Sequence, residues 1–138
     1  MFACAGLSYS NYSFADLEFD VPKVGGTSTI SASMDSFNVS LSVTNHGKMD
    51  GKVVVQVYFS QMLASRVRFS KMLLSFTKIT VKAGQTLDGV KVPVKVRDLE
   101  MWSQADNKYI VEASTYSIMV GQSSVDEKTM AHTLKVTA

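Results

Sequence analysis

Residues 37–44 read FNVSLSVT, and this stretch decides the fold. Its apolar and polar side chains alternate strictly, so an extended chain places one set against a core and the other in solvent. The same period of two returns at residues 90–97, VKVPVKVR, and at residues 15–21, ADLEFDV, where the outward set is acidic. A helix would instead need apolar residues about 3.6 positions apart. Strands are therefore predicted at all three places.

Further strands are predicted on both sides of these stretches. Residues 53–59 form a more continuous apolar run, and the turn residues between 45 and 51 predict a hairpin with residues 37–44. Pro93 cannot donate a ladder hydrogen bond, which predicts an edge or a bulge for its strand. The other predicted strands lie at residues 29–32, 76–81, 116–120 and 134–136, and residues 100–108 are predicted to be a loop.

Seven to eight short strands, with turns at intervals of about 8–12 residues, are typical of an antiparallel sandwich. The predicted fold class is all-β: an antiparallel sandwich of the immunoglobulin or fibronectin III type, whose two sheets bury their apolar faces against each other. A length of 138 residues suits one domain over residues 1–138. Residues 1–13 are interpreted as a lead-in or linker remnant.

Composition excludes several classes of function. The chain has 14 basic and 12 acidic side chains, and its net charge of +2 predicts no nucleic-acid partner. The single cysteine, Cys4, excludes an internal disulfide and a cysteine zinc site. No apolar run approaches the roughly 20 residues that span a bilayer, so no membrane partner is expected. Residues 1–12 lack the basic start of a signal peptide, and the localisation stays unknown at this point.

No group of residues predicts catalysis, a metal or a cofactor. His46 and His132 are the only histidines, and neither has acidic or cysteine neighbours at metal-ligand spacing. The chain lacks the Gly-x-Ser-x-Gly turn of a serine nucleophile. Asp16, Glu18 and Asp20 line one face of a strand. Two facing carboxylates could cleave a glycoside, but a solvated edge that discourages aggregation is the favoured interpretation.

Aromatic residues and sequons are the remaining candidate sites. Trp102, Tyr109 and Tyr58 could form a platform for stacked sugars, which requires exposed, coplanar rings, although packing on the core is the favoured interpretation. Asn11 and Asn38 each begin an Asn-x-Ser sequon and are candidates for glycosylation in a secreted protein. Two such matches are also expected by chance in a serine-rich chain.

Several blocks of sequence, in order and regularly spaced, carry a family pattern. They are GLSYS at residues 6–10, VSLSVTNHGK at 39–48, VVVQVY at 53–58, FTKI at 76–79, VKAGQ at 81–85 and TYSIMVGQSS at 115–124. Together they resemble the fibronectin type III-like domain that ends many family 3 glycoside hydrolases, such as β-glucosidases and β-xylosidases. The resemblance extends over nearly the whole chain.

The resemblance implies a non-catalytic function. In that family the nucleophilic aspartate lies in a barrel domain, and the acid/base residue comes from the barrel or from an α/β sandwich domain. Neither domain is in this chain, so the chain alone is not expected to be an enzyme. The implied function is an accessory domain that packs on those catalytic domains, its partners, and stabilises them in carbohydrate breakdown. The implied localisation is secreted or periplasmic.

Two alternatives from other classes stay open. One is a free-standing carbohydrate- or surface-binding module with polysaccharide as its partner, which would use Trp102. The other is a generic immunoglobulin-like domain that binds proteins. An accessory domain should carry an apolar patch on one outer face, and Tyr58, Val54 and Tyr12 are the residues predicted to form it. Trp102, Tyr58 and Tyr12 are therefore the candidate contacts to sugar or to another domain.

Overall fold

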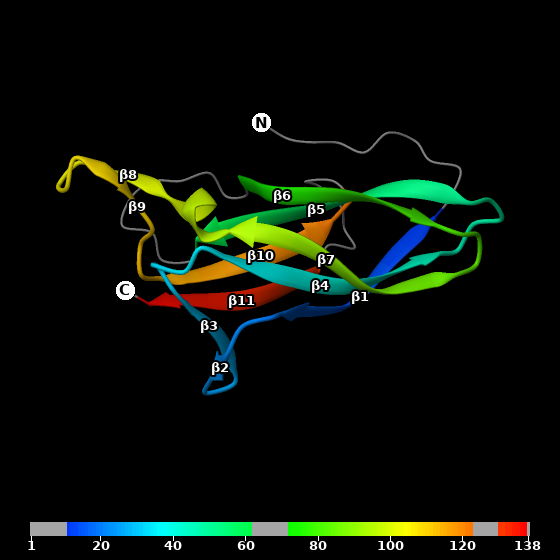
Figure 1. Ribbon diagram of the computed structural model, residues 1–138, viewed down its shortest axis with the longest axis horizontal. Helices are drawn as coiled ribbons and strands as arrows, with labels where there is room; N and C mark the ends of the chain where they lie inside the picture. Colours follow the sequence, from blue (N-terminus) through cyan, green and yellow to red (C-terminus); the bar gives the residue numbers. More distant parts are fainter. Residues whose placement is uncertain (1–10, 62–71, 123–129, 138) are drawn as a thin grey trace.

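A computed structural model describes residues 11–61, 72–122 and 130–137. It confirms the all-β sandwich, in which two facing sheets are accompanied by one short 3-10 helix (Figure 1). The three-stranded sheet has the order β1 (Tyr12–Phe19), β4 (Ser36–Asn45), β7 (Thr86–Lys95). The six-stranded sheet has the order β2 (Lys23–Val24), β3 (Thr27–Ser31), β11 (Met130–Thr137), β10 (Thr115–Gly121), β5 (Gly51–Gln61), β6 (Met72–Val81). The 3-10 helix η1 (Val96–Leu99) leads into a separate pair, β8 (Met101–Ser103) and β9 (Lys108–Ile110).

The described residues form eleven strands, more than the seven or eight predicted. The difference comes from β2, β8 and β9, which have only two or three residues each. A period of two cannot be recognised over so short a run. For the same reason the prediction that residues 100–108 form a loop is wrong, since β8 and β9 pair there as a small hairpin.

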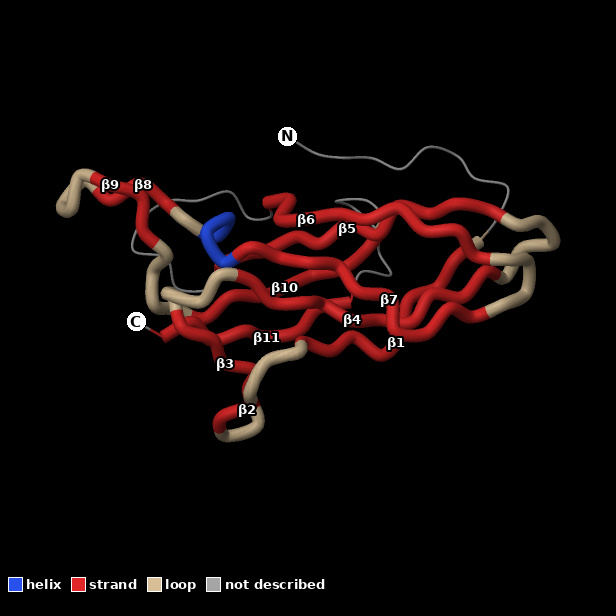
Figure 2. Tube along the Cα trace, in the orientation of Figure 1, coloured by secondary structure: helices blue, strands red, loops and turns tan. Residues whose placement is uncertain are grey.

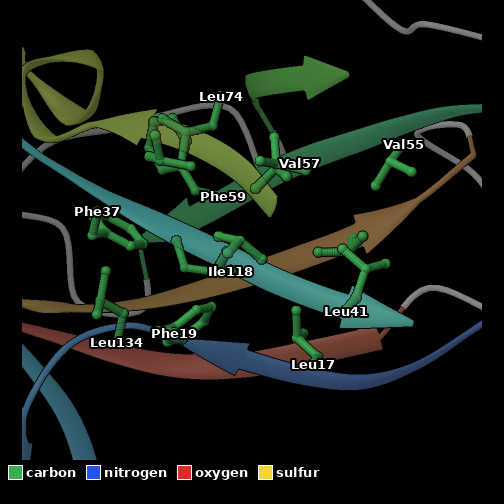
Figure 3. Close-up of a cluster of buried hydrophobic side chains, with 14 of the residues drawn as sticks. Leu17, Phe19, Phe37, Leu41, Val55, Val57, Phe59, Leu74, Ile118 and Leu134 are labelled. Carbon is green, nitrogen blue, oxygen red and sulfur yellow. The ribbon is translucent and has the colours of Figure 1, made fainter. Parts of the chain in front are cut away.

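The alternating side chains fill the space between the two sheets, as predicted. Val39 and Val92 are paired neighbours on β4 and β7, and both are fully buried. Figure 3 shows Leu41 from the three-stranded sheet in the same buried cluster as Ile118 and Val57 from the other sheet. Full burial of each such side chain contributes roughly 1.5–3 kcal/mol to the free energy of folding. This core is the main reason that the two sheets stay together.

The predicted hairpin between residues 37–44 and 53–59 is wrong. β4 lies in the three-stranded sheet and β5 in the six-stranded sheet, so residues 46–50 cross from one sheet to the other (Figure 2). Turn residues indicate only that the chain reverses. Each strand has one apolar face, and placing the two strands in opposite sheets buries both faces in the core between the sheets.

A β-bulge in β1 changes which side chains face the core. The pairing of β1 with β4 shifts between Ala15 and Glu18, and Asp16 has a φ of 56°. Phe14 packs against the core before the bulge, whereas Leu17 is buried after it. The sequence predicted Ala15 to be an inward residue, and it is exposed, because the bulge inserts one extra residue and reverses the alternation.

The prediction that Pro93 lies on an edge strand or at a bulge is confirmed. Its strand, β7, is the edge of the three-stranded sheet, as β6 is the edge of the other. The Ser75 hydroxyl on β6 donates a hydrogen bond of 2.7 Å to the Pro93 carbonyl. This bond joins the edges of the two sheets along one side of the sandwich.

Candidate functional site

The β8–β9 hairpin carries two exposed aromatic side chains. It projects from the end of the sandwich at which β7 finishes and β10 begins (Figure 1). Trp102 and Tyr109 are opposite each other in the hairpin, with 43% and 64% of their surfaces exposed. The Ser103 hydroxyl closes the turn with a bond of 2.8 Å to the Asp106 carboxylate. This hairpin, residues 101–110, is hereafter called the aromatic arm.

The two rings do not form a flat platform. Their centroids are 5.2 Å apart and their planes meet at 74°, so Trp102 and Tyr109 contact each other edge to face. Tyr58, the third predicted member, is buried. The coplanar aromatic surface that polysaccharide binding was expected to need is therefore absent from the described residues.

Basic side chains lie at the base of the aromatic arm. An open groove of about 520 Å³ is lined by Ser75, Pro93, Lys95, Arg97 and Asp98. Lys95 and Arg97 are both exposed, and their positions at the end of β7 and in η1 lead directly into β8. The groove could accept an anionic group along its rim.

The outer face of the six-stranded sheet carries an apolar strip. Leu73 and Phe76 on β6 are 48% and 65% exposed, and half-buried Val54 lies on the neighbouring strand β5. Phe76 is paired with Gln56, and Leu73 is paired with Tyr58. The side chains of Gln56 and Tyr58 are hydrogen-bonded to each other, which shows that they share the outer face of β5. Val54, Leu73 and Phe76 are hereafter called the outer strip.

Tyr58 was predicted to be exposed, and this prediction is wrong. Its side chain lies on the outer face of β5, yet only 2% of it is exposed. Its hydroxyl donates a hydrogen bond to the Gln56 side-chain oxygen. Strand parity predicts the face on which a side chain lies, but whether other residues cover that face depends on tertiary packing. Tyr58 is therefore not a surface contact in this chain.

The prediction that Tyr12 is outward is also wrong. Tyr12 belongs to the buried core, and 2% of its surface is exposed. Its residue position precedes the bulge in β1, where the side chains of Tyr12 and Phe14 face inward. The Tyr12 hydroxyl is buried and has no hydrogen-bond partner among the described residues. A buried polar atom left unpaired costs about 1–3 kcal/mol.

Tyr12→Phe is therefore expected to keep or raise the melting temperature. The change removes only an oxygen whose desolvation is not compensated, so the gain is up to about 1–3 kcal/mol. Tyr116→Phe is the matched control, because the buried Tyr116 hydroxyl donates a 2.9 Å bond to the Glu112 carbonyl. Thermal unfolding should rank the two variants in opposite directions from wild type. A lower melting temperature for Tyr12→Phe than for Tyr116→Phe would contradict this account of the Tyr12 hydroxyl.

The two sequon asparagines have different surroundings. Asn11 is exposed at the start of β1. Asn38 lies near the start of β4, the strand between β1 and β7, and its side-chain nitrogen donates a 2.8 Å bond to Asp20. Asn38 is half-buried within a strand whereas Asn11 is exposed, so Asn11 is the more accessible of the two. Glycosylation stays a prediction for both.

Asp16, Asp20 and His46 make hydrogen bonds to neighbouring parts of the fold. Asp20 also accepts a 2.6 Å bond from the Asn38 backbone, and Asp16 and Asp88 both accept from the Ser42 hydroxyl, at 3.2 and 2.9 Å. His46 Nε2 is 2.7 Å from the Ser13 hydroxyl on the surface. These contacts connect neighbouring strands and explain the residues without a catalytic role.

These features define a class: a β-sandwich domain that exposes an aromatic arm at one end and an apolar strip on one outer sheet face. Residues 53–124 match the fibronectin type III-like domain model. The chain therefore belongs to the family of fibronectin type III-like domains. Among the described residues, no helix is long and apolar enough to cross a membrane.

The chain is similar to the ends of much longer enzymes. A β-xylosidase from Formosa agariphila is 39% identical over 94% of this chain, and the match covers 17% of that enzyme. A periplasmic β-glucosidase from Salmonella typhimurium is 32% identical over 89% of this chain, covering 15% of that protein. The solved β-glucosidase from Erythrobacter marinus matches 96% of this chain and 16% of its own, with a TM-score of 0.80 and 27% identity.

These matches confirm the predicted resemblance. This chain spans only about 15–17% of the relatives' length, at their C-terminal part. The catalytic domains of these family 3 glycoside hydrolases therefore lie outside the part of the relatives that this chain matches.

Proposed function

We propose that this chain is an accessory domain that packs on the catalytic domains of a β-glucosidase- or β-xylosidase-type enzyme and stabilises them. The observation that carries this proposal is the outer strip, where Leu73 and Phe76 expose about half or more of their surfaces. Exposed apolar groups that lie together on a sheet face mark interaction surfaces. The relatives support the nature of the partner, because in each of them the part that matches this chain belongs to a far larger enzyme.

The energy available from the outer strip is sufficient for a stabilising role. Full burial of a Leu or Phe side chain contributes roughly 1.5–3 kcal/mol. Covering the exposed parts of Leu73 and Phe76 would therefore contribute about 2–3 kcal/mol in total. A contribution of that size is a large fraction of the marginal stability of a protein.

Phe76→Ser is expected to destabilise the assembled enzyme but not the isolated chain. The assembled form is a chimera in which this chain replaces the matching C-terminal segment of the Formosa agariphila β-xylosidase. The variant should shorten the thermal half-life of xylosidase activity, because serine cannot replace the apolar contact that Phe76 makes with the catalytic part of the chimera. Phe76 is already exposed in the isolated chain, so the substitution should hardly change the melting temperature of that chain.

Leu87→Ser is the matched control for this experiment. Leu87 is 42% exposed on β7, in the other sheet. It should leave the half-life of the chimera unchanged. Equal half-lives for Phe76→Ser and Leu87→Ser would show that the outer strip is not the interface. If the chimera were no more stable than the enzyme without this domain, the proposed stabilising function would be wrong.

Polysaccharide binding by a free-standing module is the alternative function. The exposure of Trp102 and Tyr109 favours it, whereas the 74° angle between the rings counts against a flat binding platform. Adsorption of the isolated chain to xylan or cellulose, lost in Trp102→Ala without a change in melting temperature, would favour the module instead.

A periplasmic or secreted location accompanies the accessory function in this proposal, since one relative is named as periplasmic.

A further inference from the structure

The aromatic arm receives little support from the rest of the described fold. β8 and β9 pair only with each other, and no described strand of either sheet is hydrogen-bonded to them. The arm is held at its base, where Val96 and Leu99 of η1 are fully buried and Val111 packs against the core. A two-stranded ribbon is at best marginally stable in water. The arm therefore gains most if another surface covers it.

The arm also has the composition of a binding hot spot. Trp and Tyr side chains are enriched among the residues that carry most of the energy of protein interfaces. Trp102 and Tyr109 contact each other edge to face, which orders both rings before any partner arrives and lowers the entropy lost on binding. The two rings thus form a preorganised apolar anchor at the end of the sandwich.

A charged rim adjoins this anchor. Lys95 and Arg97 are exposed in the groove at the base of the arm, and neither forms an ion pair within the described ranges 11–61, 72–122 and 130–137. Protein interfaces commonly have an apolar centre and a polar rim. The partner surface that fits is therefore an apolar hollow with acidic side chains beside it.

We propose that the aromatic arm docks on the catalytic part of the same hydrolase, with Trp102 and Tyr109 buried in the contact and Lys95 and Arg97 facing acidic groups. This inference rests on the proposed accessory function. The match to the Erythrobacter marinus β-glucosidase covers 96% of this chain, which leaves too few unmatched residues to omit the whole arm. In that protein the matched domain is continuous with a much larger chain, so a partner surface is present in cis.

Amide hydrogen exchange of the aromatic arm, residues 101–110, tests the proposal in both forms of the protein. In the isolated chain, the arm should exchange far faster than the central strand β4, because it lacks support from the sheets. In the β-xylosidase chimera, the same amides should exchange at least about tenfold more slowly. Trp102→Ala and Arg97→Glu should each restore faster exchange there, whereas Lys91→Glu, on the outer face of β7, should not.

Each outcome decides for or against the arm. The proposal is supported if the amides of the arm exchange more slowly in the chimera and if Trp102→Ala removes this protection. If Phe76→Ser destabilises the chimera while the arm exchanges as fast as in the isolated chain, the accessory function stands and the arm proposal is overturned. An arm as protected as β4 in the isolated chain also overturns it. Protection of the isolated arm by xylo- or cello-oligosaccharides alone would assign it to sugar, and protection that rises with chain concentration would assign it to a second copy.

Discussion

Val92→Asp is expected to leave the domain unfolded. Val92 is fully buried on β7, where it pairs with the fully buried Val39 of β4. The substitution removes roughly 1.5–3 kcal/mol of apolar burial and places an unpaired carboxylate between the sheets. The effective penalty for a buried ion is several kcal/mol, against a total stability of about 5–15 kcal/mol. Circular dichroism should therefore show loss of the β-sheet signal and no cooperative melting transition.

Lys91→Asp is the matched control for this variant. Lys91 adjoins Val92 in the chain but is exposed on the opposite face of the strand. Surface substitutions of this kind usually change stability by less than about 0.5 kcal/mol. The control should melt close to wild type. If the two variants had the same melting temperature, the assignment of inner and outer faces on β7 would be wrong.

Asn45→Ala should produce the second large effect. Asn45 is fully buried at the end of the sandwich where the chain crosses between the sheets. Its side-chain nitrogen donates to the Met49 carbonyl at 2.9 Å and to the Val81 carbonyl at 3.0 Å. Its oxygen accepts from the Gly47 amide at 2.8 Å. One side chain thus connects the crossing after β4 with the end of β6.

The alanine variant removes all three of these side-chain hydrogen bonds. A typical intramolecular hydrogen bond contributes about 0.5–1.5 kcal/mol, so a total loss of about 3 kcal/mol is expected. That loss corresponds to a fall in melting temperature of roughly 10 °C. Thr44→Ala is the control, since it removes only the exposed hydroxyl contact of Thr44 with Thr86. A loss below about 1 kcal/mol in Asn45→Ala would show that water replaces these bonds at little cost.

The candidate site was only partly predictable from the sequence. Trp102 was a candidate from its residue type, but its pairing with Tyr109 depended on a hairpin too short to be recognised. Phe76 was missed as a surface residue, although a signal existed. Ile79 and Val81 share a parity that places Phe76 on the opposite face of β6. Grouping Phe76 with those two residues as one strand concealed its outward position.

The sequence by itself determined which side chains of most strands face inward, because a period of two assigns alternate residues to opposite faces. It also determined the family, through blocks such as residues 53–58 and 115–124, which lie within the residues 53–124 that match the family model. Only the tertiary structure decided that β4 and β5 belong to different sheets, that a bulge reverses the alternation at Asp16, and that Tyr58 is covered. Those outcomes depend on contacts between residues far apart in the chain, and a local pattern carries no information about such contacts.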